Sequence, residues 1–153
     1  MAIFAKNNSK QFIPAPEGLH QATCCDVIDM GLQDNKFGPP REVVKICWQL
    51  AERMEDGRRF FVSRPFTSST YEKAALWKLL TSWLGHRFSR QEREQFDLET
   101  LLGKNCQVQI THVTGKEDQI YSRVETVVPL SPGQTEIAVE DYIRMVEREN
   151  HAA

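Results

Sequence analysis

Polar and apolar residues alternate in the middle of the chain, between residues 41 and 66. Every second position from 44 to 50 is apolar: Val44, Ile46, Trp48 and Leu50. Side chains two positions apart point to the same face of a β-strand, so these four predict a strand with one buried face. The polar segment that follows ends in Asp-Gly, which is typical of a hairpin turn. We therefore predict two antiparallel strands joined by this turn, the second over residues 58–66.

The predicted second strand combines basic and aromatic side chains. It contains Arg58, Arg59, Phe60, Phe61, Arg64 and Phe66, and the outer face of the first strand adds Arg41 and Lys45. Cations and rings on one surface suit single-stranded nucleic acid, because bases stack on rings and phosphates pair with cations. The alternative is an ordinary hairpin with its rings inside and its arginines outside. Phe60 and Phe61 are adjacent and point to opposite sides, so both interpretations stay open.

Three further strands are predicted, over residues 19–30, 104–113 and 119–130. In the first of these Asp26 interrupts an otherwise apolar side, which predicts a long, curved strand that changes its buried face partway. Between the first two strands of the chain, residues 31–40 form a loop that exposes Lys36 and Phe37. The alternative for Phe37 is that its ring plugs the end of the core.

One principal helix is predicted after the central hairpin. Ser69 or Thr70 can cap it, and Gly85 ends it. Its apolar stripe consists of Ala75, Leu76, Leu79, Leu80 and Trp83, with Trp77 at the margin of the core or, alternatively, a platform for a base. Two short helical pieces follow, the first opened by a capping box of Ser89 and Glu92. A helix is also expected in the tail, over residues 136–150.

The order of the elements is strand, strand, strand, helix, strand, strand. This order predicts a mainly β protein with an OB-fold-like five-stranded barrel whose principal helix lies between the third and fourth strands. An α+β sandwich of three and two strands is the alternative. The predicted organisation is an N-terminal lead-in (1–18), the barrel domain (19–130) and an acidic C-terminal tail (131–153).

Composition and charge narrow the class of protein. The chain is 41% hydrophobic and 26% charged, which predicts a folded globular protein, and it has no run of about 20 apolar residues that could span a bilayer. Residues 1–130 hold 17 Lys and Arg against 16 Asp and Glu, and residues 131–153 hold 2 against 5. The body is thus nearly neutral, so nucleic-acid binding would need a local basic surface. No secretion signal is recognised, and a cytoplasmic location is expected.

The sequence lacks the usual enzyme motifs. It has no phosphate-binding Walker loop, no Gly-x-Ser-x-Gly elbow and no His-Glu-x-x-His zinc motif. Four cysteines (Cys24, Cys25, Cys47 and Cys106) lack metal-site spacing, and we expect them to be reduced and buried. A Cys106–His112 nucleophile pair is a minor alternative. We therefore expect no enzymatic activity and no cofactor.

Three stretches carry a resemblance to a known family. They are PAPEGLHQATCCDVIDMG, FGPPREVVKICWQL and, after the helix, FDLETLLGKNCQVQITH with SRVETVVPLSPG. Together they cover most of residues 12–133 and resemble small bacteriophage proteins that are taken to be single-stranded-DNA-binding proteins of OB type. The resemblance implies DNA replication or recombination in a bacterial host cell. The chain ends in ERENHAA, not in the acidic Pro-Phe tip of bacterial single-stranded-DNA-binding proteins.

The leading hypothesis is sequence-independent binding of single-stranded DNA. The candidate contacts are Lys36, Phe37, Arg41, Lys45, Arg58, Arg59, Phe61, Arg64, Lys116, Tyr121 and Arg123. The alternative is a protein-interaction module for a replication, recombination or host-defence protein, with the tail as its docking element. The candidate partners are single-stranded DNA, a second copy of the chain, and replication or recombination proteins bound through the tail. No membrane partner is expected.

Overall fold

The structure is a computed structural model that describes residues 13–152 of the 153-residue chain. Its five strands are β1 (Gly18–Gln33), β2 (Arg41–Arg53), β3 (Arg59–Thr67), β4 (Asn105–Thr114) and β5 (Ile120–Val128). They form one antiparallel sheet in the order β3-β2-β1-β4-β5. This confirms the prediction of a mainly β protein with five strands. Most of the predicted lead-in, residues 1–12, lies outside the described residues.

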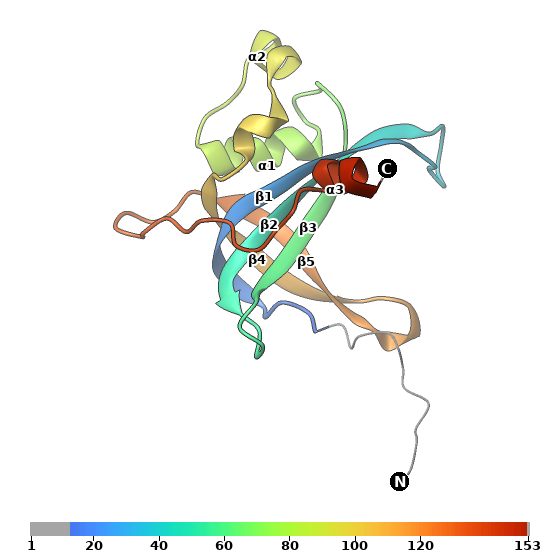
Figure 1. Cartoon of the computed structure of the whole chain (residues 1–153). Coiled ribbons are helices and arrows are strands. Elements are labelled where there is room, and N and C mark those ends of the chain that lie inside the picture. The colour runs from blue at the N-terminus through green and yellow to red at the C-terminus, as the bar shows by residue number, and fades with distance from the viewer. Residues whose placement is uncertain (1–12, 153) are drawn as a thin grey trace.

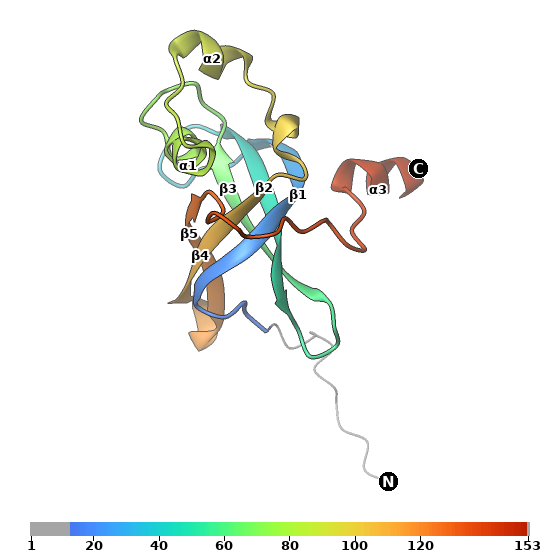
Figure 2. The same ribbon diagram turned by 90° about the vertical axis from the view of Figure 1, so that its left-hand side faces the viewer.

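The sheet curls so that its two edge strands approach each other (Figure 1). The Arg64 guanidinium on β3 bridges this gap, with Nη1 donating to the carbonyl oxygens of Val124 (3.3 Å) and Glu125 (3.4 Å) on β5. Arg64 pairs in register with Ile46, which is fully buried, so its side chain starts from the core-facing side of β3. A view turned by 90° shows the helices between β3 and β4 at one end of the curled sheet (Figure 2).

Strand β1 is the longest element and pairs with both β2 and β4. Its ladder with β2 shifts register between Cys24 and Asp26 and again between Asp29 and Gly31. Each shift is a bulge, which bends a strand and increases its twist. The prediction of a long, curved strand is confirmed, and the first bulge lies beside the Asp26 that suggested it.

The core lies inside the curl of the sheet. Trp48 from β2 is fully buried and packs against Trp83 of helix α1 (Ala75–Leu84), with ring centroids 5.9 Å apart. Each large apolar side chain buried in this way stabilises the fold by about 1.5–3 kcal/mol. Trp77 is also buried, and its Nε1 donates to the Ser69 carbonyl (2.6 Å). This placement excludes the alternative in which Trp77 stacks on a base.

The helices differ in part from their predicted positions. Helix α1 starts at Ala75, and its N-cap residue Ala74 makes no side-chain capping bond. The predicted cap at Ser69 or Thr70 was wrong, because the Ser69 hydroxyl oxygen accepts from the Tyr71 amide in a local turn. The predicted end at Gly85 is confirmed, since this residue adopts φ = 78° and its amide donates to Thr81.

The two short helical pieces are confirmed as α2 (Arg90–Gln95), with the predicted capping box, and a 3-10 helix, η1 (Leu98–Leu101). A second 3-10 helix, η2 (Lys116–Asp118), lies in the turn between β4 and β5. The tail helix was predicted too long. Helix α3 covers only Met145–Ala152, and residues 136–144 cross the sheet without helical structure. Their backbone and side chains are hydrogen-bonded to residues of β1, β2, β3 and β4.

Candidate nucleic-acid interface

The tail crosses the outer face of the sheet, where two side-chain amides hold its backbone. Asn105 on β4 accepts from the Ile137 amide (2.8 Å) and donates to the Ile137 carbonyl (2.9 Å). Gln49 on β2 does the same for Glu140, at 2.8 Å and 2.6 Å. Each amide thus pairs with the tail as a neighbouring strand residue would. These contacts explain why this segment is extended rather than helical.

The tail buries a face of the sheet that the sequence pattern predicted to be exposed. On β2, Cys47 is fully buried and Gln49 is 7% exposed, although both belong to the outer face. On β1, Cys25 and Asp26 are buried in the same layer. The four cysteines are free and buried, as predicted. Burial raises the pKa of the Cys47 thiol to about 12, so it is protonated at neutral pH.

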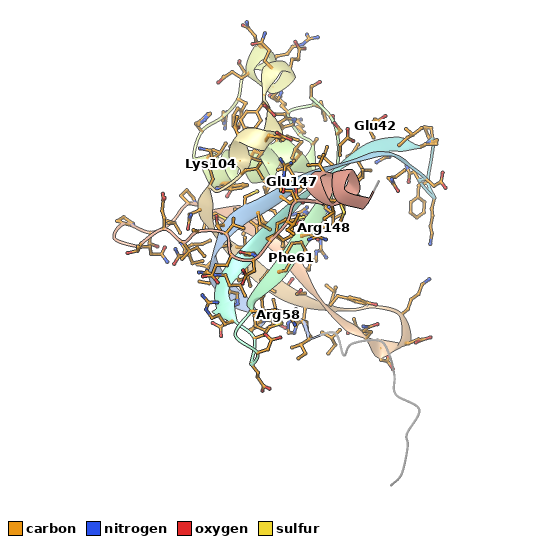
Figure 3. All side chains as sticks on the ribbon, in the orientation of Figure 1. Glu42, Arg58, Phe61, Lys104, Glu147 and Arg148 are labelled. Atoms are coloured by element: carbon orange, nitrogen blue, oxygen red, sulfur yellow. The ribbon has the colours of Figure 1, made fainter. Side chains whose placement is uncertain are left out.

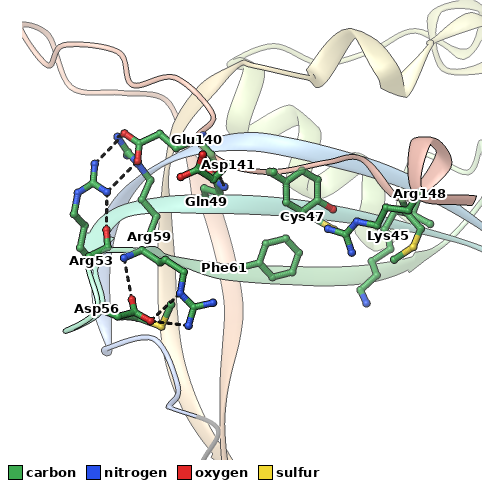
Figure 4. Close-up of a pocket in the computed structure, with 16 residues that line it drawn as sticks. Lys45, Cys47, Gln49, Arg53, Asp56, Arg59, Phe61, Glu140, Asp141 and Arg148 are labelled. Atoms are coloured by element: carbon green, nitrogen blue, oxygen red, sulfur yellow. Dashed lines mark hydrogen bonds and ion pairs between the residues drawn. The ribbon is translucent and has the colours of Figure 1, made fainter. Parts of the chain in front are cut away.

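The Glu140 carboxylate lies between two arginines (Figure 4). Arg53 donates to both of its oxygens, from Nη1 at 3.0 Å and from Nη2 at 2.9 Å, and Arg59 donates from Nη2 at 3.1 Å. Hydrogen bonds from these guanidinium groups lower the pKa of Glu140 to about 2. The Arg59 side chain is 10% exposed, and its Nε and Nη1 are buried without a partner among the described residues. This arginine therefore has donors that the carboxylate does not use.

Two aromatic rings stack beside this cluster. The Phe61 and Tyr142 rings lie 5.7 Å apart between centroids, at an interplanar angle of 16°. Phe61 projects from the outer face of β3 and is still 46% exposed. The Arg148 guanidinium covers Tyr142, 5.1 Å from the ring centroid. Tyr142 thus lies between a ring and a cation.

Asp26 anchors the tail to β1. It is 1% exposed, and its carboxylate accepts hydrogen bonds from the Tyr142 hydroxyl (2.7 Å), the Met145 amide (2.9 Å) and Arg144 Nε (3.1 Å). Burial acts to raise the pKa of Asp26, but these hydrogen bonds outweigh it and the pKa is lowered. The buried carboxylate is thus charged and compensated by the tail, and the bulge in β1 lies beside it.

A groove of about 640 Å³ lies between the tail and strands β2 and β3. Five cations line it: Lys45, Arg53, Arg58, Arg59 and Arg148. Figure 4 shows the arginine cluster at one end of the groove, Lys45 and Arg148 at the other, and Phe61 between them. Figure 3 places Phe61 and Arg148 on the same side of the molecule as the tail. The groove therefore presents a ring flanked by positive charge, with acidic groups from Asp56, Glu140 and Asp141.

Four of the predicted contact residues line this groove: Lys45, Arg58, Arg59 and Phe61. Arg58 is paired with Asp56 in the β2–β3 turn, with Nη2 and Oδ2 2.6 Å apart. Lys36, Phe37 and Arg41 belong to the β1–β2 hairpin and do not line the groove. Phe37 is 94% exposed, which excludes the alternative that its ring plugs the core.

The remaining predicted residues lie elsewhere. Lys116 is exposed in η2, and Arg123 on β5 is paired with Glu125, with Nε and Oε1 3.3 Å apart. The Tyr121 ring lies against Gly115, and its hydroxyl donates to Gln119. Arg64 joins β3 to β5, as described above. These side chains do not contribute to the groove.

Several residues of the site are not among the contacts predicted from the sequence. They are Asp26, Gln49, Arg53, Glu140, Tyr142 and Arg148. An acidic residue in an apolar strand was the one available signal, because a buried carboxylate requires donors. Tyr142 and Arg148 were assigned to the tail, and alternation alone does not show that a tail returns to the sheet.

Two further features of the described residues bear on function. Residues 13–152 contain no helix long and apolar enough to cross a bilayer. In the same part of the chain no three His, Cys, Asp or Glu side chains cluster as metal ligands would. His112 Nε2 hydrogen-bonds to the Ala15 carbonyl (2.7 Å), and Nδ1 lies 3.5 Å from Glu17 Oε1, so both ring nitrogens face partners other than a cysteine. No family model matches the sequence, and no curated protein matches it either.

Proposed function

We propose that this protein binds single-stranded DNA without marked sequence preference, in phage DNA replication or recombination. The observation that carries the proposal is the groove on β2 and β3, where the half-exposed Phe61 ring lies between two groups of cations. Rings that stack bases beside cations that pair with phosphates are the two components of sequence-tolerant single-strand binding. The net charge of −2 for the whole chain does not oppose it, because the groove itself holds five cations against the three carboxylates of Asp56, Glu140 and Asp141.

The architecture supports the same proposal. The order β3-β2-β1-β4-β5, with β3 and β5 in contact and α1 between β3 and β4, is what an OB-fold-like barrel requires. In that fold the face of the second and third strands binds oligonucleotides, flanked by the loops after β1 and between β4 and β5. Those loops carry Phe37 and Lys116, which extend the proposed interface beyond the groove.

The test is a titration of the full chain with a fluorescent oligothymidine at several salt concentrations. Phosphate contacts release counterions, so the logarithm of the binding constant falls with the logarithm of salt concentration, with a slope of about −0.7 per contact. Four contacts would give a slope of about −3. A binding constant that is independent of salt would contradict the proposal.

A pair of variants locates the interface. Phe61→Ala removes the ring of the groove and should weaken binding by about 1–3 kcal/mol. Tyr71→Ala is the matched control, because Tyr71 is 62% exposed and does not line the groove. Equal losses in the two variants would place the interface elsewhere.

A second candidate function is a protein-interaction module. It is supported by the apolar side chains that the tail leaves exposed, Ile143 at 55% and Val146 at 49%. A partner could cover these residues beside α3. Truncation after Pro132 separates the two candidates: DNA binding survives if the β2 and β3 side of the groove carries the site, whereas a partner held by the tail is lost.

A further inference from the structure

In the groove, the tail makes the same two kinds of contact that a nucleotide would make. The Glu140 carboxylate is an anion held by Arg53 and Arg59, as a phosphate would be. The Tyr142 ring is a flat aromatic group stacked on Phe61, as a base would be. Both groups come from one short acidic segment of the chain.

We infer that Arg53, Arg59 and Phe61 form a nucleotide subsite, and that the tail fills it with Glu140 in place of a phosphate and Tyr142 in place of a base. A single strand and the tail then exclude each other from this subsite. The inference deepens the proposed function and rests on it. It assigns a role to Arg53, which the sequence pattern did not single out.

The arginine contacts of the tail are replaceable. The Arg53 and Glu140 side chains are 45% and 43% exposed, and ion pairs at such exposure contribute little to stability. Arg59 keeps two buried donors, Nε and Nη1, without a partner among the described residues. A phosphate group offers oxygens in a tetrahedral arrangement, so it can accept from donors that the planar carboxylate leaves unused. Arg59 thus has donors for a phosphate beyond the one that Glu140 uses.

A separate contact holds the tail without using the subsite. The Asp26 carboxylate binds the Tyr142 hydroxyl and Arg144, and neither bond involves Arg53, Arg59 or Phe61. Displacement of the tail would expose this buried carboxylate to water and cost the hydrogen bonds it receives. The strength of this anchor therefore affects how readily single-stranded DNA displaces the tail from the subsite. Tyr142→Phe keeps the stacked ring and removes one anchoring bond.

The test compares full-length variants that differ by one charge in the tail. Glu140→Gln weakens both arginine contacts, whereas Glu136→Gln removes the same charge from an exposed residue that makes no ion pair with another described residue. Both are titrated with the fluorescent oligothymidine. Competition predicts that Glu140→Gln binds about three- to ten-fold more tightly than the unmodified chain. Glu136→Gln should change affinity by less than about two-fold, which measures the effect of charge alone.

Equal affinities of Glu140→Gln and Glu136→Gln would overturn the inference while leaving the proposed function intact. A synthetic peptide of residues 136–148 gives an independent readout, because it should release the oligothymidine from the Glu140→Gln protein. The same peptide carrying Glu140→Gln should release it less effectively. Release by neither peptide would also contradict competition. Absence of binding by every variant, including Glu140→Gln and the truncation after Pro132, would instead reject the proposed function, and the inference with it.

Discussion

The Asp26 carboxylate on β1 accepts a hydrogen bond of 2.7 Å from the hydroxyl of Tyr142, 116 residues further along the chain. This bond joins a buried charge in the sheet to the tail that covers it. The bond compensates the charge of Asp26, which is 1% exposed. It also fixes the position of Tyr142, whose ring stacks on Phe61. Asp26 therefore contributes both to the stability of the fold and to holding the tail over the groove.

Asp26→Asn should lower the free energy of unfolding by about 1–3 kcal/mol, because donors that face a carboxylate are left without their charged acceptor. Urea unfolding followed by tryptophan fluorescence measures it. Asp34→Asn is the control, since Asp34 lies exposed in the β1–β2 loop and should change stability by less than about 0.5 kcal/mol. Equal unfolding midpoints for the two variants would contradict a stabilising role for the charge of Asp26.

Stability should fall in acid partly through these two carboxylates. The pKa values of Asp26 and Glu140 are lower in the folded chain than their ordinary values, so the unfolded chain takes up protons first as the pH falls. Their contribution is present above pH about 5 and is lost progressively toward pH 2. The cations that face them are the guanidinium groups of Arg144, beside Asp26, and of Arg53 and Arg59, beside Glu140. Urea unfolding at a series of pH values should give a shallower decline for Asp26→Asn than for the unmodified chain, and parallel curves would contradict this assignment.

Thiol labelling should report the position of the tail. Cys47 lies under the tail on the outer face of β2, whereas Cys106 lies fully buried in the core. Removing residues 139–153 should accelerate labelling of Cys47 several-fold and leave Cys106 protected, because only the first loses its cover. Mass spectrometry of peptides after a timed reaction with a maleimide distinguishes the two. Faster labelling of both would indicate general unfolding instead of exposure of one face.

Gly115→Ala should displace the Tyr121 ring. A methyl group at Gly115 would overlap the ring carbons of Tyr121, so the ring must move out of its present position. We expect a loss of about 1 kcal/mol in thermal or urea unfolding. Gly38→Ala is the matched control, because its methyl group would meet only Asn35 Nδ2 at an ordinary 3.5 Å. Stability unchanged in both variants would mean that Tyr121 packs loosely against the hairpin.

The strands could be predicted because their evidence is local. Val44, Ile46, Trp48 and Leu50 are each 0–9% exposed, as their alternation indicated. Capping signals at Ser89 and an end signal at Gly85 also act over a few residues, and both were correct. The cap predicted at Ser69 or Thr70 failed because other local bonds compete with capping: the Ser69 hydroxyl accepts from the Tyr71 amide, and the Ser69 carbonyl accepts from Trp77 Nε1.

The site was harder to predict because its contacts join residues far apart in the chain. Arg59 and Glu140 are 81 positions apart, and Gln49 and Glu140 are 91 positions apart. The amphipathic pattern of residues 136–150 suggested a helix, but backbone bonds to Asn105 and Gln49 favour an extended segment over most of it. The periodicity of a segment indicates only the secondary structure that the segment favours by itself. Here hydrogen-bond partners on the sheet outweigh the preference for a helix.

Because the occupant of the groove is part of the same polypeptide, its local concentration is fixed by the length of chain that links it to the sheet. For a short linker this concentration is of millimolar order. Dilution of the protein therefore does not change the fraction of molecules whose groove is occupied by the tail. A ligand in solution, by contrast, displaces the tail from more molecules as the concentration of the ligand rises. Residues 129–138, which connect β5 to Val139, thus act together with the Asp26 anchor in setting how strongly any incoming molecule must bind before it displaces the tail.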